Sequence, residues 1–187
     1  PLPKPGMMII PVSGRSEDLV QSVRTWLGMY HAGLSTGATE GVILDAWAEV
    51  CGRWEGLVGT ADRVAVARAA AVKRILHRAW AWAPCLRGSL IAPLDGWRCY
   101  DGNLRVTLFL RQHRRWVLVW NASASRYSRS ELSLPAEAGG AAVDRAVEVP
   151  GAAGVVGGRV FDARRGRITI PVELAPGDAM LVELFGS

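Results

Sequence analysis

Long hydrophobic runs are missing from this chain of 187 residues. A membrane-spanning helix needs about 20 consecutive apolar residues, and no run approaches that length. The first residues, Pro1-Leu2-Pro3-Lys4-Pro5-Gly6, also lack the apolar segment and cleavage site of a secretion signal. We therefore expect no membrane association, and a cytoplasmic location if the chain is complete. Because the sequence does not begin with Met, we also consider that it is a fragment of a longer protein.

Cysteine and histidine are scarce, with three residues of each. Cys51, Cys85 and Cys99 form no CxxC pair, and no histidine stands at zinc-ligand spacing from them. The glycine-rich stretch Gly154–Gly158 does not open a helix, so it does not fit a phosphate-binding loop. These absences predict no metal site, no cofactor and three free thiols in a reducing compartment.

Lysine is nearly absent, so arginine carries most of the formal net charge of +5. A basic chain binds nucleic acid when its cations gather on one face. Here the arginines are scattered from Arg53 to Arg167, which disfavours nucleic acid as a partner. Half of the residues are hydrophobic, which is enough to fill a core.

The first half of the chain is organised around the stretch Glu40–Trp47. Its apolar run Val42–Leu44 is closed by Asp45, a pattern typical of a strand buried on both faces of a parallel sheet. An earlier short strand is predicted over Met7–Val12. Because parallel strands present functional side chains at their carboxyl ends, Asp45 becomes a candidate site residue.

Two long helices are predicted on either side of that central strand. The first follows an N-cap at Ser16, and Gly33 and Gly37 are predicted to end it. The second begins at Thr60 and is predicted to end at Pro84. The order strand, helix, strand, helix indicates α/β architecture. The apolar stripe of the first helix consists of Leu19, Val20, Val23, Trp26, Leu27, Tyr30 and His31.

The helical period disappears after the turn signal Asp95-Gly96. Over Leu104–Leu110, apolar residues alternate with residues such as Thr107 and Phe109, which predicts a strand with one exposed face. A short turn then leads to a returning strand over Arg115–Trp120. Further strands are predicted over Glu131–Leu134, Ala146–Val149, Gly158–Phe161, Arg167–Val172 and Ala179–Phe185.

Short strands at this spacing predict an antiparallel β-sandwich. The Ala/Gly-rich stretch Pro135–Ala142 is expected to be one loose loop. We place a domain boundary near residue 95, with β/α units in residues 1–95 and the sandwich in residues 96–187.

Several motifs bear a family resemblance. In the second half, Trp116–Asn121 matches a VLVxN strand, and Leu174–Ala179 matches an L-x-PGDA turn before the last strand. Together with the first half, these motifs resemble the end of a glycoside hydrolase TIM barrel and the β-sandwich that follows it. The first-half motifs are Lys4-Pro5-Gly6-Met7-Met8-Ile9-Ile10, a helix with Arg24, Trp26 and Tyr30, Gly37-Ala38, Gly41-Val42-Ile43-Leu44-Asp45-Ala46-Trp47 and Trp54-Glu55-Gly56-Leu57-Val58.

The resemblance implies the terminal β/α units of a (β/α)8-type barrel, a following antiparallel sandwich and a carbohydrate ligand. A whole barrel takes about 250 residues. It therefore also implies a fragment, or a chain that works with a separate barrel half or an oligomer partner. Glycosidases use a pair of carboxylates. The predicted strand that the resemblance aligns with the seventh barrel strand ends at Val12-Ser13-Gly14, where no carboxylate stands. Glu17 and Asp18 lie nearby but are typical of a helix start. The catalytic residues therefore stay unassigned.

Four residues form the candidate substrate-binding set. Asp45 is predicted either to hydrogen-bond sugar hydroxyls or to cap the following turn. Trp47 is predicted either to stack under a sugar ring or to plug the top of the barrel. Glu49 also reads as a solvated loop carboxylate, and Trp54 as a residue packed on the second helix.

The remaining aromatic and histidine residues leave two readings open. His31, on the apolar stripe, reads as a core histidine rather than a base. Trp97, Tyr100, Trp116 and Trp120 either line a carbohydrate-binding face or pack against the core and the neighbouring barrel. We therefore hold two hypotheses: the C-terminal segment of a carbohydrate-active enzyme, glycoside hydrolase-like, or a non-catalytic carbohydrate-binding or structural sandwich module.

Overall fold

The computed structural model describes residues 6–11, 19–37, 39–45, 77, 81–151 and 158–186. For residues 7–11, 19–23, 26 and 39–45 it describes the backbone alone.

A parallel strand pair joined by a helix forms the N-terminal part. The elements are β1 (Gly6–Pro11), α1 (Leu19–Thr36) and β2 (Thr39–Asp45). β1 pairs with β2 in parallel, with Ile9 opposite Ile43 and Pro11 opposite Asp45. Both predicted strands are confirmed, and the crossover through α1 makes a βαβ unit. The other β/α units of a barrel are not seen in the described ranges.

Glycine ends α1 where a left-handed backbone is needed. Gly37 has φ of 72°, and its N–H donates to the Leu34 carbonyl at 3.1 Å. This confirms the predicted C-cap at Gly37. The prediction that Gly33 ends the helix is wrong, because Gly33 lies inside α1.

The second predicted helix is described at residue 77 and over residues 81–86. The prediction that it ends at Pro84 is wrong. Proline removes only its own N–H, so the next residues continue the helix, and the Arg87 N–H donates to the Ala83 carbonyl at 2.9 Å. The helix ends at Leu86, and the turn that follows it contains Gly88, whose φ is 71°.

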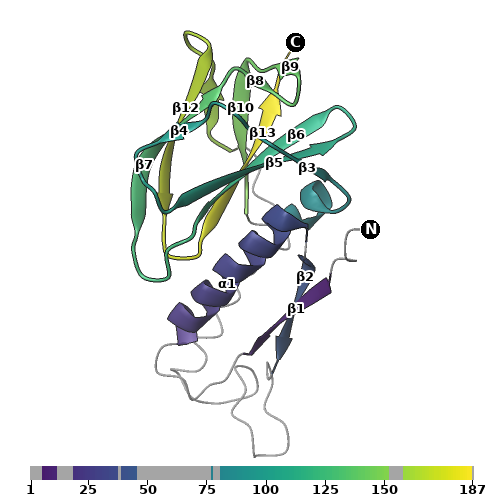
Figure 1. Cartoon of the computed structure of the whole chain (residues 1–187), viewed down its shortest axis with the longest axis vertical. Helices are drawn as coiled ribbons and strands as arrows, with labels where there is room; N and C mark the ends of the chain where they lie inside the picture. The colour runs from purple at the N-terminus through teal and green to yellow at the C-terminus, as the bar shows by residue number, and fades with distance from the viewer. Residues whose placement is uncertain are drawn as a thin grey trace, which may run out of the picture.

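Two antiparallel sheets and a small hairpin make up the rest of the described chain (Figure 1). The six-stranded sheet has the order β11-β10-β13-β6-β5-β3, and the three-stranded sheet has the order β12-β7-β4. The strands are β3 (Leu90–Ala92), β4 (Arg98–Cys99), β5 (Leu104–Arg111), β6 (Arg114–Asn121), β7 (Ser128–Pro135), β8 (Glu137–Ala138), β9 (Ala141–Ala142), β10 (Arg145–Val149), β11 (Val160–Asp162), β12 (Arg167–Leu174) and β13 (Ala179–Phe185).

The antiparallel sandwich predicted from the sequence is confirmed, including the β5–β6 hairpin. The short strands β3, β4, β8 and β9 were not predicted, since two or three residues are too few to show a period. The expected loose loop over 135–142 contains the β8–β9 hairpin instead. Its turn uses Gly139 and Gly140, both with positive φ. β3 pairs with β5 and precedes the boundary proposed near residue 95.

The two sheets enclose the larger core. Its largest fully buried side chains include Leu104, Leu132, Ile168 and Ile170. In β12, buried and exposed residues alternate along the strand. One face of this three-stranded sheet therefore points outward.

The other face of the six-stranded sheet is covered by helices, and this corrects the prediction for β5. Thr107 and Phe109 were expected on an exposed face, but both are buried. The Thr107 hydroxyl donates to the Ser35 hydroxyl of α1 at 2.7 Å, and Phe109 shares a core cluster with Leu27, Tyr30 and Leu86. α1 thus lies between the β1–β2 pair and the sandwich (Figure 1).

None of the described helices has the length and apolar character needed to span a bilayer.

Candidate functional site

The predicted site lies at the carboxyl edge of the β1–β2 pair. Asp45 is the last residue of β2 and stands opposite Pro11, the last residue of β1. Both strands run in the same direction, so Asp45 lies where a parallel sheet presents functional residues. Its side chain is outside the described features. Trp47, Glu49 and Trp54 fall outside the described residues, as do Glu17 and Asp18, and their roles stay predictions.

The joint between α1 and the sandwich carries the buried histidine. His31 is only 2% exposed, and its Nδ1 lies 3.1 Å from the carbonyl oxygen of Gly177. Because a carbonyl can only accept, Nδ1 carries the proton and donates. Its ring also lies near Trp120, with centroids 6.3 Å apart. The interpretation of His31 as a core histidine is confirmed.

Burial lowers the pKa of His31 from 6.5 to about 4, although the hydrogen bond to Gly177 and the charge of Asp178 act in the opposite direction. Desolvation disfavours the imidazolium, so the ring is neutral at pH 7. It is therefore a structural group in this chain and does not act as a proton carrier.

We predict that stability falls in mild acid because of His31. The unfolded chain takes up the His31 proton near pH 6.5, whereas the folded chain does so near pH 4. This contribution is therefore complete above pH 6.5 and is lost as the pH falls toward 4. One pKa unit is about 1.4 kcal/mol, so the unfolding free energy should drop by about 3 kcal/mol. Urea unfolding at several pH values measures it. His31→Gln should flatten this slope, and an unchanged slope in that variant would contradict the assignment.

The L-x-PGDA motif forms the turn that meets α1. The Asp178 N–H donates to the Ala175 carbonyl at 3.0 Å, and Gly177 has φ of 69°, as the third residue of a type II turn requires. Gly177 lies against α1: its Cα would stand 3.4 Å from a Cβ added at Gly28. A Cβ added at Gly177 would overlap the carbonyl oxygen of Arg24. Only glycine fits this contact.

The VLVxN motif supports the same turn. The Asn121 side chain is fully buried and donates to the carbonyls of Arg126 and Leu174 at 2.7 and 3.1 Å. The backbone N–H of Asn121 donates to the Asp178 backbone carbonyl at 2.9 Å. The Asn121 backbone carbonyl accepts from the Gly177 N–H at 3.1 Å. The two motifs that carry the family resemblance in the second half therefore join each other and hold the sandwich on α1.

The four aromatic residues proposed for a binding face divide into different environments. Trp116 is fully buried and Trp120 is 9% exposed, both in the cluster between the sheet and the helices. Trp97 packs against the core between the sheets. Tyr100 is fully exposed. Packing in the core is thus the confirmed reading for Trp116 and Trp120, and the four aromatic residues do not form one face.

The cysteines and charged residues that the structure describes do not form a metal-binding site. Cys85 and Cys99 are free and half-buried, while Cys51 lies outside the described residues. Burial raises the pKa of the Cys85 thiol, which favours its protonated form. The described residues contain no cluster of three or more His, Cys, Asp or Glu able to hold a metal ion.

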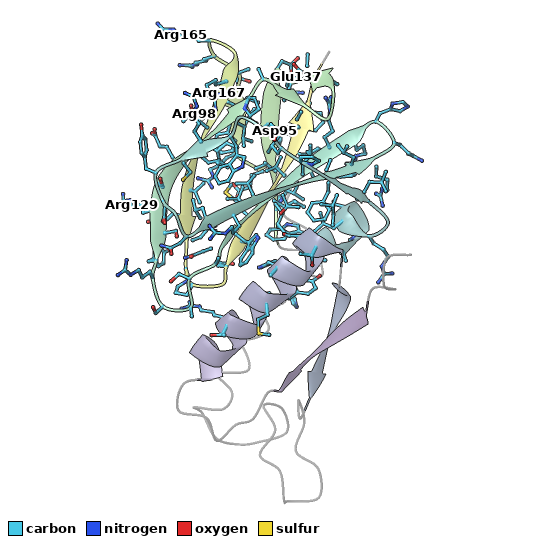
Figure 2. All side chains as sticks on the ribbon, in the orientation of Figure 1. Asp95, Arg98, Arg129, Glu137, Arg165 and Arg167 are labelled. Carbon is cyan, nitrogen blue, oxygen red and sulfur yellow. The ribbon has the colours of Figure 1, made fainter. Side chains whose placement is uncertain are left out.

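At the end of the sandwich away from α1, charged side chains of both signs project outward (Figure 2). Arg167 donates to the Gly96 carbonyl at 2.8 Å and to the Ser133 hydroxyl at 2.6 Å. Arg98 and Arg165 lie in the same region as Asp95 and Glu137 (Figure 2). This surface is a mixture of charges rather than a basic patch.

No protein-family model matches the sequence, and no curated protein matches it. Solved structures do. The α-amylase from Geobacillus thermoleovorans, complexed with acarbose, matches 98% of this chain with a TM-score of 0.53 at 9% identity. AmyP in complex with maltose matches 91% with a TM-score of 0.50 at 11% identity. The chain spans only 39% and 36% of those two proteins. At such identities, the likeness is one of fold: a glycoside hydrolase-like arrangement of a βαβ unit and a β-sandwich.

Proposed function

We propose that this chain is the C-terminal segment of a carbohydrate-active, glycoside hydrolase-like enzyme. The observation that carries the proposal is the packing of the crossover helix α1 between a parallel strand pair and the sandwich. The likeness of more than nine-tenths of the chain to AmyP in complex with maltose and to an α-amylase complexed with acarbose supports it.

In this proposal, residues 1–95 supply the last β/α units of a (β/α)8-type barrel and residues 96–187 form the C-terminal sandwich. The remaining barrel strands come from a preceding part of the same protein, a separate barrel half or an oligomer partner. The ligand is a carbohydrate, held at the carboxyl ends of the barrel strands. The catalytic carboxylates belong to the rest of the barrel, since no pair is assigned in this chain.

The four site residues have separate proposed tasks. Asp45 accepts hydrogen bonds from sugar hydroxyls at the strand end, and Trp47 offers an indole face to the sugar ring. Glu49 and Trp54 lie in the following loop at the rim of the site. The burial of Trp116 and Trp120 against helices supports a structural, rather than ligand-binding, task for that face of the sandwich.

The proposal predicts that the isolated chain does not hydrolyse glycosides. Aryl-glycosides and maltooligosaccharides incubated with the purified chain should release no product. The same assay on a protein that adds the coding sequence upstream of Pro1 should show hydrolysis. A stable, monomeric isolated chain that cleaves aryl-glycosides would overturn the proposal. An upstream reading frame without further β/α units would exclude the version in which the same protein supplies the rest of the barrel.

Asp45→Asn in that longer protein should lower kcat/KM by about ten- to a hundredfold, because a charged hydrogen bond contributes about 1.5–3 kcal/mol. Glu131→Gln, a change of the same kind at an exposed position of β7 in the sandwich, should leave kcat/KM nearly unchanged. If Asp45 caps the turn instead, its substitution will lower the melting temperature and spare kcat/KM, and the substrate-binding role will be wrong.

A further inference from the structure

A pocket that no sequence motif indicated lies where the ends of β10, β12 and β13 meet helical residues 81–86. Its volume is about 300 Å³, which falls at the small end of the roughly 300–1,000 Å³ typical of small-molecule sites. The residues that decide its chemistry are Trp82, Glu148, Arg159, Glu173, Leu174 and Met180.

Buried apolar side chains back the pocket but expose little surface to it. Trp82 is 3% exposed, and Leu174 and Met180 are also buried. The Trp82 Nε1–H donates to the Val149 carbonyl at 3.1 Å, so the indole is fixed against the end of β10. The accessible lining is therefore mostly polar, and the fixed indole behind it does not have to reorganise around a ligand.

The lining of the pocket carries charged groups of both signs. Arg159 Nε donates to Glu148 Oε2 at 2.6 Å, and its guanidinium lies 5.6 Å from the Phe161 ring centroid. These contacts orient the guanidinium and leave its Nη donors available. Glu173 is exposed on β12, and among the described residues it has no ion-pair or hydrogen-bond partner. Among the described residues, the lining thus combines an acceptor without a partner, Glu173, with a donor held in place, Arg159.

The charges select the class of ligand. Two carboxylates and one guanidinium leave the lining at a net charge of −1, which disfavours anions, and the described residues hold no set of metal ligands. A polyhydroxylated ring fits, because its hydroxyls both donate to Glu173 and accept from Arg159. A lining that is mostly polar suits such hydroxyls better than it suits an apolar ligand.

We propose that this pocket binds one ring of a neutral sugar, as a site separate from the strand-end residues Asp45 and Trp47. The choice of a sugar among polyhydroxylated ligands rests on the proposed function, whereas the pocket and its charges do not.

Isothermal titration of the purified chain with maltose tests the site. Maltose should bind with one-to-one stoichiometry, and Glu173→Gln should weaken it by about tenfold, because a hydrogen bond to a charged acceptor is lost. Arg159→Gln should weaken it similarly. The matched control is Glu131→Gln, the same change at an exposed position of β7 outside the pocket, and it should leave affinity unchanged.

Absence of binding for maltose, glucose, galactose and xylose would overturn the site. So would equal weakening by Glu173→Gln and Glu131→Gln. Failure of the proposed function is a different result. Maltose binding by the chain, together with no hydrolysis by the longer protein, would contradict the proposed enzymatic function but support the proposed sugar site. Hydrolysis by the longer protein, without maltose binding that depends on Glu173, would contradict only the proposed sugar site.

Discussion

Gly177→Ala should lower the unfolding free energy by about 3–4 kcal/mol, the largest effect we expect from adding a single methyl group. Left-handed backbone costs a non-glycine residue about 1–2 kcal/mol. In addition, the new Cβ would overlap the Arg24 carbonyl oxygen and lie 2.7 Å from its carbon. The turn would have to withdraw from α1 and would lose the hydrogen bond to His31. Chemical denaturation monitored by circular dichroism measures the loss.

Gly166→Ala is the matched control for this prediction. Gly166 has nearly the same backbone, with φ of 74°, but no atom stands within 4 Å of an added Cβ. It should therefore show the backbone cost alone, about 1 kcal/mol. If both substitutions cost the same, the contact between the turn and α1 does not contribute to stability.

Trp116→Ala should cost about 3–5 kcal/mol, in the range measured for large aromatic residues in cores. Trp116 is fully buried in the cluster that joins the sheet to the helices. The guanidinium of Arg114, held by a bidentate ion pair with Glu183, lies 4.9 Å from its ring centroid. Removing the indole empties the centre of this joint, and thermal melting should show a marked fall in Tm.

Trp116→Phe separates packing from hydrogen bonding at the same position. Trp116 Nε1 is buried without a partner among the described residues, so replacing the indole by a phenyl ring loses no hydrogen bond. We expect a cost of about 1 kcal/mol, from lost volume alone. A phenylalanine variant as unstable as the alanine variant would show that Nε1 has an essential partner.

These predictions converge on one feature, the joint between α1 and the sandwich. His31, Gly177 and Asn121 are linked across it, from three distant parts of the chain. A helix fixed in this way holds β1 and β2 at a constant orientation to the sandwich. In the proposed function, this joint positions the strand ends that carry Asp45 in the barrel.

Sequence reasoning worked best where a local period repeats. The alternation over residues 104–110 and 167–172 located β5 and β12, and the helical stripe located α1. Gly37 was identified as a C-cap because few other residues adopt positive φ. The candidate site is less certain from sequence. Of its residues, Asp45 is placed at a strand end, whereas the tasks of Trp47, Glu49 and Trp54 remain predictions.

By itself, the sequence determined the longer strands, the first helix and the core position of His31, because side-chain period and turn residues act within a few positions. Only the tertiary structure decided what covers each face. Thr107 and Phe109 look solvent-facing in the sequence, yet Thr107 meets Ser35, 72 residues away. The pocket between Trp82, Glu148 and Glu173 likewise joins distant segments. The period of the apolar residues predicts which residues share one face of a strand or helix. Which element packs on that face depends on contacts between distant segments, and no local pattern encodes those contacts.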